Sequence, residues 1–100
     1  MGKLTIIYWR DIPAQVIGQQ GRTRVKKVLD GRFAVAIDRA AMRAGKGSSH
    51  AYLDEWRREG RSFEGDLQAA VESEVARLEV EFPDDLLEIT VKAGGILKKD

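Results

Sequence analysis

The chain has no cysteine, one histidine and two prolines among its 100 residues. Without cysteine it can form no disulfide, no catalytic thiol and no thiolate metal ligand. Any catalysis that needs an imidazole would depend on His50 alone. These absences exclude several common classes of enzyme, and they agree with a reducing compartment.

The sequence also lacks a long apolar run. No segment approaches the roughly 18 apolar residues of a membrane-spanning helix, and charge at Arg10 interrupts the first apolar stretch, unlike a secretory signal. We therefore expect a cytoplasmic protein without membrane association. Apolar residues make up 43% and charged residues 33%, which together with the length predicts a single globular domain over residues 1–100.

Acidic residues are scarce in the first half of the chain, and basic residues are outnumbered by acidic ones in the second half. Residues 1–50 hold ten Lys or Arg against three Asp, a balance of +7, whereas residues 51–100 hold seven basic against thirteen acidic residues, a balance of −6. In a compact fold the halves would neutralise each other. Alternatively, the molecule has a basic and an acidic side, which would orient a partner.

Three extended segments are predicted in the first third of the chain. Residues 3–9 carry apolar side chains on both faces, because Ile6 and Tyr8 alternate with Ile7 and Trp9. Residues 14–18 follow after a short link, which favours an antiparallel neighbour. Residues 22–29 alternate loosely and indicate a third strand or an exposed basic edge.

Apolar spacing predicts a helix in residues 30–47, with Asp30 as its N-cap and Gly45 after its end. A second helix is predicted over residues 65–82, before Pro83. Two further segments are ambiguous: 48–60 favours a short strand over a helix, and 84–95 favours a helix over a strand. Residues 96–100 are expected to fray. The predicted fold is α+β: a small, mainly antiparallel sheet of about three strands with two to three helices packed on one face.

Several chemical motifs are weak. His50 lies in a Gly/Ser segment and is expected to be a solvated loop residue, and "GKGSS" at 45–49 lacks the spacing of a phosphate loop. The acidic residues of 72–85 have no cation-binding spacing. The basic run 22–27 has no aromatic ring to stack a base. We therefore expect no metal, no cofactor and no nucleic-acid partner.

A more promising cluster is an aromatic–arginine rim at one end of the expected sheet. Each tryptophan precedes an arginine, whose guanidinium can stack on an indole. Trp, Tyr and Arg are also the residues that dominate protein-binding hot spots. The alternative is an aromatic core with arginines lying over it. The residues predicted to contact a partner are Tyr8, Trp9, Arg10, Asp11 and Arg57.

Over residues 4–82 the chain resembles the virulence-factor family, and also the C-terminal part of the larger conserved virulence factor C proteins. The resemblance rests on the segments "YWRDIPAQVI", "RFAVAIDRAAMRAG", "AYLDEWRR" and "AAVESEVARLE". It implies a bacterial, stand-alone, cytoplasmic protein with no assigned catalytic residues. It further implies a genetic association with corrinoid-dependent methyl transfer and methylenetetrahydrofolate reduction.

Two functions of different classes follow. The first is a non-catalytic accessory protein that binds a protein partner or a second copy of itself, in a methyl-transfer setting if the resemblance is a guide. The second is a small ligand-binding or enzymatic domain that uses the aromatic–arginine rim as its site.

Overall fold

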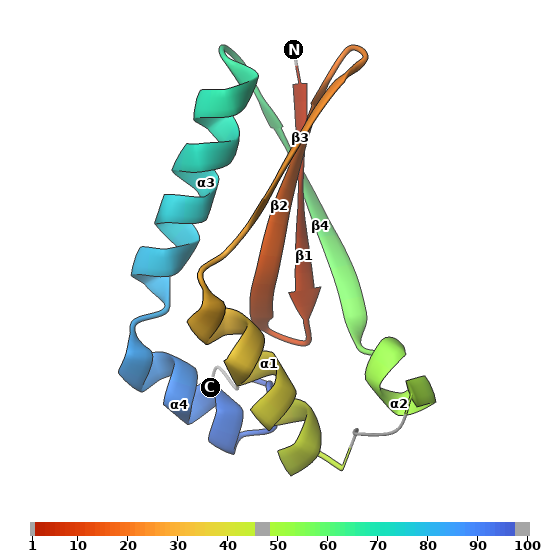
Figure 1. The fold of residues 1–100 in the computed structure, drawn as a ribbon, viewed down its shortest axis with the longest axis vertical. Coiled ribbons are helices and arrows are strands. Elements are labelled where there is room, and N and C mark those ends of the chain that lie inside the picture. Colours follow the sequence, from red (N-terminus) through yellow and green to blue (C-terminus); the bar gives the residue numbers. More distant parts are fainter. Residues whose placement is uncertain (1, 46–48, 98–100) are drawn as a thin grey trace.

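Over residues 2–45 and 49–97, which this computed structural model describes, the chain forms one antiparallel sheet and four helices (Figure 1). The order of the strands across the sheet is β3-β2-β1-β4. This confirms the predicted α+β class, with one strand more than expected. The elements are β1 (Gly2–Trp9), β2 (Ile12–Gln20), β3 (Thr23–Val28), α1 (Gly31–Arg43), α2 (Ser49–Leu53), β4 (Trp56–Phe63), α3 (Leu67–Glu81) and α4 (Asp84–Lys92).

The prediction of a short strand from residue 48 onward is wrong for its first part. Ser49–Leu53 is helix α2, and the strand begins only at Trp56. The register explains the difference, because β1 ends at Trp9 and pairs with β4 from Trp56 onward. Helical geometry instead brings the Tyr52 ring against both tryptophans. Residues 46–48 of the "GKGSS" segment lie outside the described residues.

One face of the sheet forms the hydrophobic core with α3. Leu4, Ile6 and Val16 are buried on this face, and α3 packs against β1, β2 and β3. Gly18 allows the close approach: a Cβ at that position would lie 2.5 Å from Val71 and 2.7 Å from a Leu67 methyl. Helix α1 packs against β2 and α4 at the lower end of the sheet.

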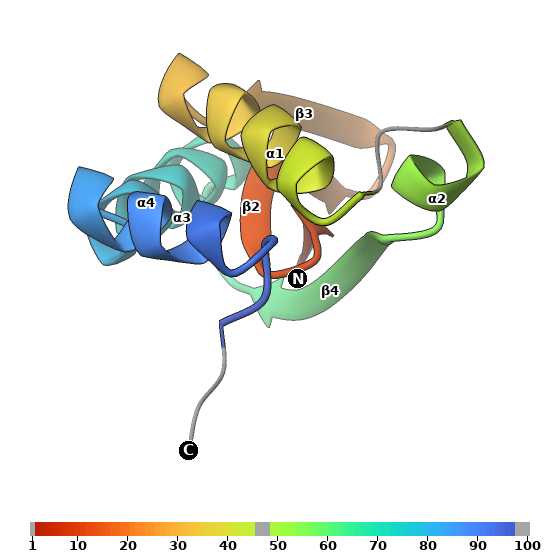
Figure 2. The same cartoon turned by 90° about the horizontal axis from the view of Figure 1, so that it is seen from below.

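The opposite face of the sheet has little cover. Figure 2 shows α3 and α4 on one side and the short α2 on the other, near the end of β4, with α1 between them at the lower end of the sheet. The residues of this outer face are exposed or partly exposed, including Thr5, Ile7 and Ile17. Apolar residues on both faces of β1 would suit a covering layer on each side. The layer is present on the outer side only at the Trp9 end.

Capping residues set the helix ends, as predicted for Asp30 and Gly45. The Asp30 side chain accepts a hydrogen bond from the Arg32 amide at the start of α1, and Asp66 accepts one from Ala69 at the start of α3. Gly45 has a φ of 72° just past α1, a left-handed conformation that glycine adopts without steric cost. The preference for a helix over 84–95 is confirmed by α4, with Asp84 and Asp85 at its positive end.

Candidate functional site

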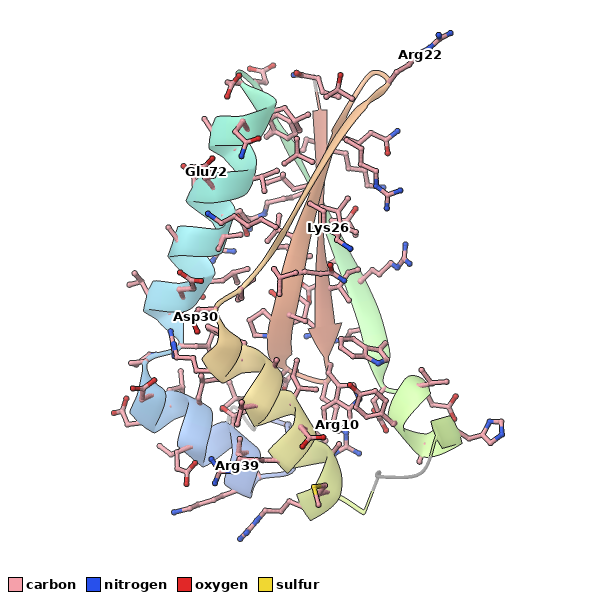
Figure 3. The ribbon with its side chains drawn as sticks, viewed as in Figure 1. Arg10, Arg22, Lys26, Asp30, Arg39 and Glu72 are labelled. Atoms are coloured by element: carbon pink, nitrogen blue, oxygen red, sulfur yellow. The ribbon has the colours of Figure 1, made fainter. Side chains whose placement is uncertain are left out.

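The five residues of the predicted rim meet at the lower end of the sheet. Register pairs Trp9 with Trp56 and Tyr8 with Arg57 across β1 and β4. Arg10 and Asp11 form the turn between β1 and β2. Figure 3 shows Arg10 at this end of the sheet, beside α1. The structure therefore brings together residues that lie almost 50 positions apart in the sequence.

Trp9 is the base of the rim and is inaccessible to solvent, with an exposed fraction of 0%. Its indole Nε1 donates a hydrogen bond to the Tyr52 carbonyl oxygen at 2.9 Å. The Tyr52 ring stacks on the indole at 5.8 Å and meets the Trp56 ring edge-on at 5.7 Å. Trp56 is partly buried and packs against the core. The three rings hold α2 against the sheet.

Arg10 points inward rather than toward solvent. Its side chain is 14% exposed, and its guanidinium donates to the Gly94 carbonyl oxygen at 2.9 Å and to the Glu55 carboxylate at 3.2 Å. The guanidinium lies 5.4 Å from the centre of the Trp9 ring. These contacts join the β1–β2 turn to the chain before β4 and to the segment after α4.

Asp11 pairs with Arg57 rather than with its sequence neighbour Arg10. Arg57 donates to the Asp11 carboxylate at 3.4 Å and to the Arg10 carbonyl oxygen at 2.7 Å. The second Asp11 carboxylate oxygen accepts from the Leu97 amide at 2.6 Å. Part of the 96–100 segment, expected to fray, is thus tied to the rim; residues 98–100 lie outside the described chain.

Tyr8 and Arg57 are the accessible part of the rim. The Arg57 guanidinium lies 4.3 Å from the centre of the Tyr8 ring, so the expected stacking partner, Trp56, is replaced by Tyr8. Partial burial, with a further effect of the Glu59 carboxylate, raises the pKa of the Tyr8 phenol above its usual 10.0. The phenol is therefore a weaker acid here than in a free tyrosine.

A hollow of about 320 Å³ adjoins the Tyr8 ring between β4 and α3. Its arginines are held by carboxylates: Arg61 pairs with Glu74 at 3.3 Å, and Arg77 pairs with the same carboxylate. Glu74 is only 6% exposed, so these two partners compensate a buried charge. The residues that line the hollow are Ile6, Tyr8, Glu59, Gly60, Arg61 and Arg77.

The remaining candidates stay apart from the rim. His50 is exposed on α2, a helix rather than the expected loop. The basic run 22–27 forms the β2–β3 turn and most of the edge strand β3. Within residues 2–45 and 49–97, no three His, Asp or Glu side chains gather as a metal site would require. In the same part of the chain, no helix has both the length and the apolar character to cross a membrane.

Sequence reasoning missed the contribution of the segment after α4 and the burial of Glu74. Gly94 and Gly95 have φ angles of 73° and 95° and bring two carbonyl oxygens to the Arg10 side chain and the Asp11 amide. A Gly-Gly pair after a predicted helix indicates a sharp change of direction. It does not indicate which part of the fold receives the chain.

A comparison with known protein families gives a match. The model of the family described as "Virulence factor" matches residues 7–91, which include all five residues of the rim, the ambiguous segment 48–60 and most of the ambiguous segment 84–95. No curated protein and no solved structure matches the chain.

Proposed function

The chain belongs to the virulence factor family, and from this premise we propose that it is a non-catalytic accessory protein that binds a protein partner through the aromatic–arginine rim. The accessible contact would be the stacked Tyr8 and Arg57 side chains with Asp11. The buried Trp9 and Arg10 would hold that contact in place.

The observation that carries this proposal is the rigid presentation of an exposed arginine on an aromatic ring. Arg57 is 40% exposed, yet its Nε and Nη atoms are fixed by Arg10 and Asp11, and its guanidinium lies on the Tyr8 ring. A side chain ordered in advance loses less entropy on binding. Tyr and Arg are also enriched among residues whose truncation most weakens protein complexes.

The chemistry at the rim favours binding over catalysis. The pKa of Tyr8 is raised, whereas a catalytic phenol or base would need a pKa moved toward the working pH. Arg57, Arg61 and Arg77 each pair with a carboxylate, so their charges are already compensated. The family resemblance, rather than any rim residue, suggests a component of corrinoid- or folate-dependent methyl transfer as the partner, with a second copy of the chain as the alternative.

The experiment compares Arg57→Gln with Arg22→Gln. Arg22 is exposed at the tip of the β2–β3 turn and points away from the sheet (Figure 3), so it controls for the loss of one charge. Both variants and the wild type are used as bait in extracts of the native cell, and their self-association is measured by light scattering. We expect Arg57→Gln to weaken association by at least tenfold, as a hot-spot residue would. Arg22→Gln should associate as the wild type does.

Thermal unfolding of the same variants separates binding from folding. If Arg57→Gln unfolds well before the wild type, its loss of binding would not support the rim as a contact. Tyr8→Phe is then the second variant, because it keeps the ring under Arg57 and removes only the hydroxyl. Equal association of the wild type and all three variants would contradict the proposal.

The hollow beside Tyr8 favours ligand binding as a second candidate function. Its polar lining and its volume of about 320 Å³ suit a small polar molecule. A thermal-shift screen of small metabolites would test this. A stabilising compound whose effect is lost in Arg77→Gln, but kept in Arg22→Gln, would favour it over the protein-binding proposal.

A further inference from the structure

The outer face of the sheet is basic and carries no carboxylate on its strands. The alternation of side chains along each strand, together with the register between strands, identifies the residues of all four strands that point to this face. The acidic residue of β4, Glu59, pairs with Ile6 and so points to the α3 side. The outward positions are Lys3, Thr5 and Ile7 on β1; Gln15, Ile17 and Gln19 on β2; Arg24, Lys26 and Val28 on β3; and Arg58, Gly60 and Ser62 on β4.

Four cations of this face have no carboxylate partner. Lys3, Arg24, Lys26 and Arg58 are all exposed, and none of them takes part in an ion pair within the described part of the chain. On the opposite face of β4, by contrast, the arginines pair with Glu59 and Glu74. Within the part of the chain that the structure describes, no ion pair therefore compensates these four positive charges.

Three of these cations surround one hollow of about 170 Å³. Register aligns Arg24, Gln19 and Lys3 in one row across β3, β2 and β1. In the next row Gly60 has no side chain, and the Lys3 chain lies over it: a Cβ there would be 3.1 Å from the Lys3 Cε. The residues that line the hollow are Lys3, Thr5, Ile17, Gln19, Arg24 and Arg58.

We propose that this hollow binds the phosphate group of a small phosphorylated ligand. Two arginines can each donate paired hydrogen bonds to phosphate oxygens, and Lys3 adds a third positive charge. The Thr5 hydroxyl and the Gln19 amide are further donors, and Ile17 forms an apolar floor. A phosphate monoester carries a charge of about −1.5 to −2 at neutral pH, which three uncompensated cations offset.

The arrangement fits a compact ligand better than a nucleic-acid strand. Proteins that bind single strands combine a basic groove with aromatic rings on which the bases stack. The lining of this hollow contains no aromatic ring, and three of its six residues are cationic. The site shares no residue with the rim, so the phosphate-binding proposal can be tested independently of the proposed function.

The direct test is an NMR titration of the isotope-labelled wild-type protein with inorganic phosphate, at constant ionic strength maintained with chloride. We expect saturable shifts of backbone amides confined to β1, β2, β3 and β4 around the hollow. Ribose 5-phosphate should shift the same amides, and ribose should not. Linear, unsaturable shifts over the whole surface would overturn the proposal.

Arg24→Gln and Arg22→Gln form the matched pair. Both arginines are exposed and lie two positions apart, but only Arg24 lines the hollow. Arg24→Gln should weaken phosphate and ribose 5-phosphate binding by at least fivefold, and Arg22→Gln by less than twofold. Arg58→Gln, on a different strand, should repeat the loss, which excludes a local disturbance of β3 as the cause.

A final arm tests the class of ligand with a single-stranded RNA of eight nucleotides lacking terminal phosphates. The small-ligand proposal predicts that the RNA binds no more tightly than ribose 5-phosphate. RNA binding that is much tighter and depends on Arg24 would overturn it and assign the face to nucleic acid. Equal affinity of Arg24→Gln and Arg22→Gln for every ligand would show that the face is simply solvated.

Discussion

Arg10 adopts a left-handed backbone conformation, with a φ of 54°, in a turn where a glycine would pay no steric cost. The contacts of its side chain account for the choice of residue. The guanidinium binds Gly94 and Glu55 and covers the Trp9 indole, although its Nε has no hydrogen-bond partner among the described residues. At the scale of the single residue, the rim therefore has a structural role, because Arg10 holds the segment after α4 against the β1–β2 turn.

Replacing Arg10 with Ala should therefore destabilise the protein. We expect the free energy of unfolding to fall by about 2 kcal/mol, because the variant loses charge-assisted hydrogen bonds and leaves the Gly94 carbonyl without its donor. Arg43→Ala is the matched control: Arg43 also donates to a main-chain carbonyl, that of Lys92, but is exposed, and its loss should cost about 0.5 kcal/mol or less. Urea unfolding measures both, and equal effects would show that the Arg10 contacts contribute little.

The raised pKa of Tyr8 gives a second prediction at this scale. Burial is the larger cause and the Glu59 carboxylate the next, so Glu59→Gln should lower the Tyr8 pKa toward its usual 10.0. Ultraviolet titration of the phenolate in a Tyr52→Phe background isolates Tyr8, and Glu64→Gln serves as the control. Because the folded chain holds the phenol proton more tightly than the unfolded chain, stability should decline as the pH rises past 10. An unchanged Tyr8 titration in Glu59→Gln would contradict this account.

At the scale of elements, the sequence predicted best where one physical signal dominated. Helix α1 shows an apolar face, an N-cap and a C-terminal glycine that agree with one another, and β1 and β2 are joined by a link too short for any other pairing. Strand β4 offers no such signal, because its segment "WRREGRSF" is polar on both faces. Its inner arginines pair with carboxylates of α3 and β4 itself, which no local pattern reveals.

The aromatic–arginine rim was only partly predictable for the same reason. Two Trp-Arg pairs on neighbouring strands indicated a cluster, and the structure places them side by side. The actual pairing of Asp11 with Arg57, and of Arg10 with Glu55, depends on the turn conformation and on the segment after α4. Those contacts join residues more than 40 positions apart. Contact of the rim with a partner stays a prediction.

The docking of the segment after α4 predicts a strong effect of Gly95→Ala. The residue has a φ of 95°, and a Cβ would lie 2.9 Å from the Trp9 ring. Gly65→Ala is the control, since its φ of 94° is nearly the same but nothing lies within 4 Å. The control should lose only the roughly 1–2 kcal/mol of backbone strain. Gly95→Ala should lose a further 1–3 kcal/mol or so, because the Trp9 ring must shift. Equal losses in denaturant melts would mean that the segment does not pack on Trp9.

At the scale of the whole molecule, charge is neutralised in some places and kept in another. Ion pairs across the two halves of the chain neutralise one another, as Arg10–Glu55, Arg32–Asp84 and Arg39–Glu88 do. The outer sheet face keeps its positive charge, and most of the core lies between the inner face and the helices, with Trp9 and Ile12 buried at the lower end of the sheet. The molecule is thus a two-layer fold in which the outer face of the sheet is accessible to a ligand.

This one-sided architecture predicts opposite results for two adjacent residues of β2. Val16 is fully buried on the inner face, whereas Ile17 lies partly exposed on the outer face. Substitution with Thr keeps the β-branched shape that suits a strand. Val16→Thr should lower the free energy of unfolding by about 1–3 kcal/mol, because the threonine hydroxyl would be buried in an apolar site that offers it no hydrogen-bond partner. Ile17→Thr should cost at most about 1 kcal/mol, as partly exposed positions do.

Denaturant melts at two protein concentrations decide whether the outer face is free. A second copy seated on it would bury Ile17 and link unfolding to dissociation, so stability would rise with protein concentration. The cost of Ile17→Thr would then approach that of Val16→Thr and would depend on concentration in the same way. The two-layer fold instead requires a small cost for Ile17→Thr that does not change with concentration. That outcome would leave the basic outer face accessible to the phosphorylated ligand that we propose for it.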